Sequence, residues 1–189
     1  MTRYRSLPKA AALLSRRSLC LGGAALALAA TVGLAGCSTT PTAICPRVAV
    51  LEQASALTRF QPGGGQARDD VMFKADINRV DTDCKYSGAG NADLEANLRL
   101  YITAERGPAL KGNTANAEYF VVITDRGGIV LAKRTFPLKI DFGNLQAVNL
   151  TEGTWQYFRL NRGGGAGYEI WTGWQLSDAE LEYNRQARP

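Results

Sequence analysis

The stretch DLEANLRLYITA, residues 93–104, carries the most regular pattern in this chain. Polar, charged or aromatic residues fill its odd-numbered positions. Apolar residues fill every even-numbered position: Leu94, Ala96, Leu98, Leu100, Ile102 and Ala104. Successive side chains of a β-strand point to opposite faces, so a period of two over this length predicts a half-buried strand with one wet face. A helix would scatter the same apolar residues around its circumference.

Shorter alternations of the same kind occur on both sides of this stretch. They comprise Val71, Phe73, Ala75 and Ile77 in one set, and Phe136, Leu138, Ile140 and Phe142 in another. The segments EYFVVITD and GIVLAKR flank Arg126-Gly127-Gly128, which predicts a hairpin turn because glycine accepts a positive φ. The segments TWQYFRL and YEIWTGWQL flank NRGGGAG, residues 161–167, which predicts a second hairpin with a longer loop.

With RVAVL and CKY included, this pattern predicts eight or nine strands spaced by turn signals. We therefore expect a mainly β protein, an antiparallel immunoglobulin-like β-sandwich; an open barrel is the alternative. The chain ends differently. Ser177 and Glu180 fit a capping box, and Leu176 and Leu181 fit the hydrophobic staple around it. A short C-terminal helix from about 178 to 186 follows from these signals.

The charge of the chain is unevenly distributed. Of the 22 basic residues, five lie before residue 37, where there is no acidic residue. The remaining 17 basic residues are equal in number to the 17 acidic residues of the chain. The part after residue 36 is therefore formally neutral. It lacks the basic cluster that binding to phosphates requires, so we expect no nucleic-acid partner.

Residues 1–36 have the parts of an export signal: a basic start, an apolar centre over 19–34 and a small-residue end. The end, Leu34-Ala35-Gly36-Cys37, resembles the lipobox of bacterial lipoproteins. The resemblance implies that Cys37 is acylated and becomes the N-terminus, that residues 37–45 are a short tether, and that the lipid is the membrane partner. A plain secreted protein is the alternative. Ser15-Arg16-Arg17 leaves the twin-arginine and general secretion routes both open.

This reading places the chain in the cell envelope, anchored by lipid and facing the periplasm. Ser38, where an aspartate would retain such proteins at the inner membrane, favours the outer membrane. Residues 46–189 are long enough for one sandwich domain with one core. Once Cys20 leaves with the leader and Cys37 is lipidated, Cys45 and Cys84 are the remaining thiols, and in an oxidising compartment we expect them to form a disulfide. Two separate buried thiols are the alternative.

Sequence features for catalysis are few. Histidine is absent, which removes the commonest general base and transition-metal ligand, and no CxxC occurs. We predict no catalytic residue, no metal and no cofactor, so the protein is expected not to be an enzyme. A hydrolase that uses carboxylates among Asp141, Glu152 and Glu169 is the least favoured alternative. Asp81-Thr82-Asp83 is interpreted as a turn rather than a calcium site.

An aromatic cluster is the strongest binding signal. Six aromatic residues lie within about twenty positions: Trp155, Tyr157, Phe158, Tyr168, Trp171 and Trp174. In the last strand Tyr168, Ile170 and Trp174 share one face and Trp171 lies on the other. If the first set is core, then Trp171, with Trp155 and Tyr157, is a candidate contact for a ligand or partner. The alternative is that both faces are covered and Trp171 packs under a loop.

The globular part also resembles small uncharacterised lipoproteins of Gram-negative bacteria. The matching residues are Cys45-Pro46, Leu57 to Phe60, Arg106-Gly107-Pro108, Tyr119 to Val122 and the closing LSDAELEYNR. This resemblance implies no activity. Together these features predict a lipid-anchored, non-enzymatic interaction or assembly module with an unidentified envelope protein as its partner. The alternative is a module that binds peptidoglycan or another glycan through exposed aromatic residues.

Overall fold

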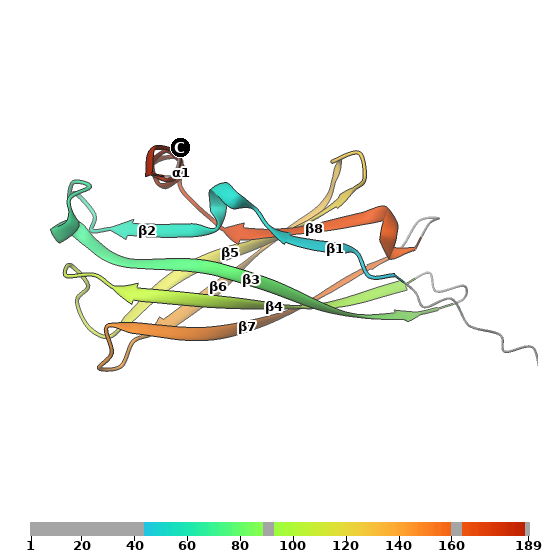
Figure 1. Cartoon of the computed structure of the whole chain (residues 1–189), viewed down its shortest axis with the longest axis horizontal. Coiled ribbons are helices and arrows are strands. Elements are labelled where there is room, and N and C mark those ends of the chain that lie inside the picture. The colour runs from blue at the N-terminus through green and yellow to red at the C-terminus, as the bar shows by residue number, and fades with distance from the viewer. Residues whose placement is uncertain (1–43, 89–92, 160–163, 188–189) are drawn as a thin grey trace, which may run out of the picture. The chain divides into compact units, whose positions relative to one another are not determined.

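The alternating stretch forms an inner strand of a sheet. The computed structural model describes residues 44–88, 93–159 and 164–187 (Figure 1). Strand β4 (Asp93–Arg106) contains the whole stretch, and its six even-numbered apolar residues are at most 2% exposed. Its sheet has the order β2-β3-β4-β7, with β2 at Ala56–Phe60, β3 at Val71–Ser87 and β7 at Ala147–Arg159. All neighbours in this sheet are antiparallel.

A second four-stranded sheet packs against the first. Its order is β1-β8-β5-β6, with strands at Arg47–Val50, Tyr168–Trp174, Thr114–Asp125 and Val130–Asp141. Strand β1 runs parallel to β8, and the other pairs are antiparallel. The buried core mixes side chains of both sheets, and β5 and β6 cross behind β3 and β4 in Figure 1. The expectation of a mainly β, sandwich-like protein is thereby confirmed at this level.

The β5–β6 hairpin is confirmed. The two strands pair from Thr114↔Asp141 to Thr124↔Val130, and the turn between them uses Gly128 at φ 82°. The Ile129 N–H donates to an Asp125 carboxylate oxygen at 2.9 Å, which closes the turn. Glycine fits here because a side chain at that φ is strained.

The second hairpin prediction is wrong. Strand β7 pairs with β4 in one sheet, whereas β8 pairs with β5 and β1 in the other. The chain therefore crosses between the sheets after β7, where residues 160–163 lie outside the described part. The local alternation was correct for both strands, but it does not specify the partner of a strand.

Strand β3 is longer than the sequence pattern indicated. VMFKADI and CKY belong to one strand of 17 residues, because an irregularity between Ile77 and Arg79 shifts the alternation and hides its continuity. Asp81 and Asp83 both lie within this strand, opposite Arg99 and Asn97 of β4. The interpretation of Asp81–Asp83 as a turn is therefore wrong.

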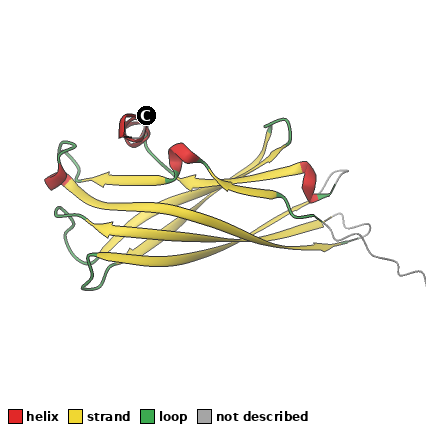
Figure 2. Cartoon of the chain, viewed as in Figure 1, coloured by secondary structure: helices red, strands yellow, loops and turns green. Residues whose placement is uncertain are grey.

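The C-terminal helix is confirmed as α1 (Asp178–Ala187), and its capping box is formed. The Glu180 N–H donates to the Ser177 hydroxyl at 3.3 Å, and the Ser177 N–H donates to the Glu180 carboxylate at 2.8 Å. The buried Asn184 amide donates to the Ala56 carbonyl at 2.7 Å and the Gln53 carbonyl at 3.1 Å. These bonds hold α1 against β2 and against the short 3-10 helix η1 (Glu52–Ala54) that precedes it (Figure 2).

The predicted leader, residues 1–36, and the predicted lipidation site, Cys37, lie outside the described residues. Within the described part, no helix has the length and apolar character that a membrane span requires.

Candidate functional site

The junction between the N-terminal segment and the sandwich is held by a disulfide, as expected from the sequence. Cys45, just before β1, is bonded to Cys84 in β3, and their Cα atoms are 5.8 Å apart. Because β1 and β3 belong to different sheets, this bond links the two layers covalently. The bond also fixes the chain at Cys45, the point where a tether from Cys37 would enter the domain.

A tyrosine completes this junction. The Tyr86 hydroxyl donates to the Ile44 carbonyl and accepts the Gly165 N–H at 3.0 Å. Gly165 opens the 3-10 helix η3 (Gly165–Gly167), and a Cβ there would lie 2.1 Å from the Tyr86 hydroxyl. Only glycine allows so close an approach of these three segments.

The outer surface of β3, β4 and β7 carries many charged, polar and aromatic side chains. We call it the β3–β4–β7 face. Adjacent strands place their outward residues in rows across it, because facing residues of antiparallel strands lie side by side. Its members are Arg79, Asp81, Asp83 and Lys85 from β3, Glu95, Asn97, Arg99 and Tyr101 from β4, and Gly153, Trp155 and Tyr157 from β7.

Trp155 and Tyr157 are the large apolar groups of this face. Their exposures are 42% and 61%, far above those of the core aromatics. The Lys85 ammonium lies 5.8 Å from the centre of the Trp155 ring. A hydrogen bond to the Glu95 carboxylate raises the pKa of Tyr157 and orients its hydroxyl. Both rings thus lie on the exposed side of β7, and each has a polar partner on β3 or β4.

Four of the six charged residues of the β3–β4–β7 face form ion pairs. Arg99 donates to Asp83 at 2.7 Å, and Arg79 lies 3.2 Å from Asp81. The Arg79 guanidinium also lies 4.1 Å from the centre of the Tyr101 ring. Three cations and three anions stand on the face, so it offers many hydrogen-bonding groups but little net field. Such a surface suits a neutral polar ligand better than a polyanion.

The third predicted contact residue, Trp171, lies elsewhere. Tyr168, Ile170 and Trp174 are buried as expected, and Trp171 is on the opposite side of β8, half-buried among β1 and β5. It belongs to the outer surface of the second sheet. The structure therefore groups Trp155 with Tyr157 and separates both from Trp171, because β7 and β8 are in different sheets.

The acids considered for hydrolysis are not brought together. Asp141 and Glu169 face opposite ends of β5, at Thr114 and Thr124, which places them about 33 Å apart along the strand. Glu152 instead faces the core and accepts the Tyr119 hydroxyl at 3.3 Å. Burial, and secondly the Glu152 charge, raise the pKa of Tyr119 to about 12.

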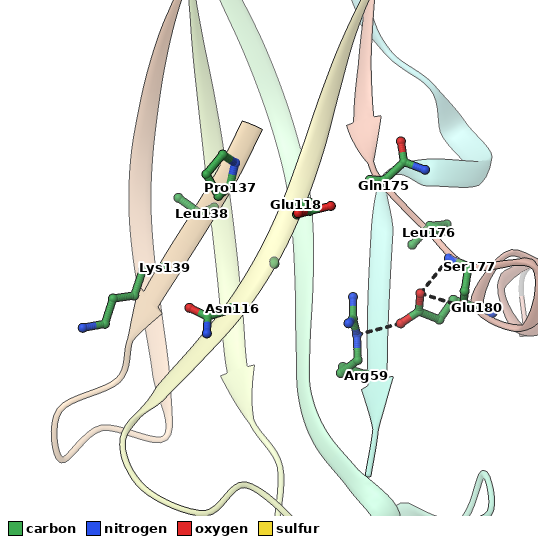
Figure 3. Close-up of a pocket in the computed structure, with 11 residues that line it drawn as sticks. Arg59, Asn116, Glu118, Pro137, Leu138, Lys139, Gln175, Leu176, Ser177 and Glu180 are labelled. Atoms are coloured by element: carbon green, nitrogen blue, oxygen red, sulfur yellow. Dashed lines mark hydrogen bonds and ion pairs between the residues drawn. The ribbon is translucent and has the colours of Figure 1, made fainter. Parts of the chain in front are cut away.

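A pocket of about 630 Å³ lies beside α1 (Figure 3). One wall carries Glu180, whose carboxylate forms an ion pair with Arg59 at 2.7 Å and accepts hydrogen bonds from both the N–H and the hydroxyl of Ser177. The opposite wall carries Glu118 and Lys139 of β5 and β6. With two hydrogen bonds from Ser177 and an ion pair to Arg59, the Glu180 carboxylate is committed to fixing the start of α1, and we assign the pocket no chemistry.

Sequence reasoning missed most of the β3–β4–β7 face. Asn97 and Arg99 are among the polar odd-numbered residues of the 93–104 alternation, and only their register against β7, opposite Trp155 and Gly153, brings them beside Trp155. The available signal was the polarity of those odd positions. The identity of the neighbouring strand was not readable from local sequence.

The comparisons with known proteins find no relative. The chain matches no protein-family model, no curated protein and no solved structure at a significant level. Function must therefore be argued from the residues alone.

Proposed function

We propose that this protein is a lipid-anchored envelope protein that faces the periplasm, in the outer membrane, and acts as a non-enzymatic interaction module. The LAGC sequence at residues 34–37 supports the anchor. The disulfide between Cys45 and Cys84 supports an oxidising compartment. The absence of histidine from the sequence and the wide separation of Asp141 from Glu169 support a binding role rather than catalysis.

The β3–β4–β7 face is the proposed binding surface. The observation that carries this assignment is the exposure of Trp155 and Tyr157 on a sheet surface, among paired charges. Large rings bury much area and lose little rotamer freedom, so they contribute strongly to interfaces. An envelope protein is the first candidate partner.

A glycan such as peptidoglycan is the second candidate ligand. The open position at Gly153 favours it, because a Cβ there would meet no atom within 4 Å, which leaves a shallow space beside Trp155 and Arg99. A sugar ring can stack on Trp155 while its hydroxyls bond to Asp83, Arg99 and Asn97. A carboxylate-based hydrolase is the least supported proposal.

The immunoglobulin-like assignment of the sandwich is likewise a proposal. Two packed four-stranded sheets joined by chain crossings support it. The run β2-β3-β4, with three consecutive strands in one sheet, departs from the A-B-E-D order of an immunoglobulin sheet.

The anchor is tested by the substitution Cys37→Ala in cells fed a labelled fatty acid. We expect the label and the association with membranes to be lost, because a diacylglyceryl group can attach only to that thiol. The matched control is Cys20→Ala, which removes a cysteine of the leader and should leave labelling unchanged. Labelling that survives in Cys37→Ala would contradict the anchor.

The binding surface is tested by Trp155→Ala and Tyr157→Ala. We expect each to weaken binding to purified peptidoglycan sacculi, or to a crosslinked envelope protein, by about tenfold or more, as truncation of a central aromatic does. Trp171→Ala is the control on the other sheet and should bind normally. Equal loss in all three variants, or in none, would exclude the β3–β4–β7 face.

In-cell crosslinking followed by mass spectrometry separates the two candidates. A reproducible envelope protein that is lost in Trp155→Ala would favour the assembly role. Retained peptidoglycan fragments without a protein partner would favour the glycan.

A further inference from the structure

The tip of the β5–β6 hairpin is an exposed apolar segment. Ile129, Val130 and Leu131 are 65%, 60% and 51% exposed. A register shift between Ile123 and Thr124 pairs Val130 with Thr124, so Val130 faces away from the side of β6 that carries the buried Leu138 and Ile140. Three consecutive large apolar residues in water are unfavourable for a domain that needs only to be soluble.

The tip lies at the end of the domain where the tether enters. The register runs Arg47↔Glu169, Glu169↔Thr124 and Thr124↔Val130, so these four residues form one row across the second sheet. Val130 is thus level with the start of β1 and about 14 Å from it across three strand spacings. Figure 1 shows the β5–β6 loop at the same end as the start of β1, and α1 at the other end.

The tether is short enough to keep this end at the bilayer. Seven residue steps separate Cys37 from Ile44, which span at most about 25 Å when fully extended. Ile44 is itself 68% exposed. The proposed anchor on Cys37 would therefore keep the hairpin tip within reach of the lipid surface.

The charges around the tip suit a membrane surface. Lys133 and Arg134 follow it on β6, both are exposed, and no ion pair within residues 44–88, 93–159 and 164–187 involves either. Arg126 precedes it, exposed, and donates to the Ala166 carbonyl at 2.7 Å. The carboxylate of the half-buried Asp125 accepts the Ile129 N–H within the turn. Apolar residues flanked by basic ones bind the headgroup region of anionic bilayers.

We propose that Ile129, Val130 and Leu131 insert into the bilayer interface as a second, non-covalent membrane contact, with Lys133 and Arg134 on the lipid headgroups. This inference rests on the proposed anchor at Cys37. A second contact at the tip, about 14 Å from the start of β1 across the sheet, would fix the tilt of the domain, whereas a tether alone leaves it free to rotate.

The test uses the full mature lipidated chain in vesicles of phosphatidylethanolamine and phosphatidylglycerol. Ile129→Cys carries an environment-sensitive dye, and Leu145→Cys is the matched control, because Leu145 is 60% exposed between β6 and β7 at the other end. The dye reacts with the added cysteine, because the lipid blocks Cys37 and the disulfide joins Cys45 to Cys84. Brominated lipids then report contact with acyl chains, and buried Trp174 reports that each variant is folded.

We expect bromine quenching of the dye at 129 to exceed that at 145 several-fold, and to fall in Lys133→Glu. Equal quenching at both positions while the protein sediments with the vesicles would overturn the inference and leave the anchor standing. A dye at 129 that is shielded from water but not quenched would also overturn it, because a second copy of the chain, and not lipid, then covers the tip. If the unsubstituted chain does not sediment with vesicles, the anchor fails and the inference fails with it.

Discussion

The substitution Leu98→Ala is expected to lower the free energy of unfolding by about 2–5 kcal/mol. Leu98 is 0% exposed and lies in the middle of β4, between Thr82 of β3 and Thr154 of β7. Paired strands on both sides prevent the backbone from moving in to fill the space that three lost carbon atoms leave. A loss of this size is a large part of the stability of a typical domain.

Urea unfolding of the mature domain, followed by the fluorescence of buried Trp174, measures the effect of Leu98→Ala. Leu145→Ala is the control, because the same atoms are removed from a side chain that is 60% exposed, and it should change stability by about 0.5 kcal/mol or less. Similar midpoints for the two variants would contradict the central place of β4 in the core.

Removing the disulfide by Cys45→Ala with Cys84→Ala is the second large effect that we expect. The two cysteines are 39 residues apart, and closing a loop of that length contributes about 4 kcal/mol in the chain-entropy model. Strand β1 has four residues and a single neighbour, β8, in its sheet. We therefore expect it to open first when the link to β3 is lost.

Two measurements check this expectation. The urea midpoint of the double variant should match that of the unsubstituted domain after reduction, and both should lie well below that of the oxidised domain. Hydrogen exchange at Val48 and Val50 should become faster in the double variant than at Leu98, where exchange reports only the loss of global stability. A midpoint that reduction does not alter would contradict a stabilising disulfide.

The elements that the sequence predicts well are those with complete local signals. The alternation of β4 has no interruption, so its bounds and its buried face follow from side-chain direction alone. The start of α1 is equally local, because Ser177 and Glu180 bond to each other's backbone. The β5–β6 turn needs only a glycine with positive φ.

Pairing between distant strands was not predictable in this way. Nothing in the sequence of β7 shows whether its partner is β8 or β4. The pairing depends on the packing of the whole core. The same limit applied to the candidate site. Trp155 and Tyr157 were identified as candidates, but their separation from Trp171 follows from the sheet to which each strand belongs. The shifted alternation at Asn78 similarly concealed that Asp81 and Asp83 are strand residues.

The position of the disulfide also decides how the domain bears mechanical load. A pull on a membrane anchor at Cys37 arrives at Cys45 before it reaches β1, and the covalent bond passes it to Cys84 in β3. Force would then enter β3, which is paired with β4 at Cys84 and with β2 over residues 71–76, instead of peeling four residues of β1 away from β8. Under tension on the proposed anchor, β1, the shortest strand of the sandwich, would be bypassed and β3, the longest, would carry the load.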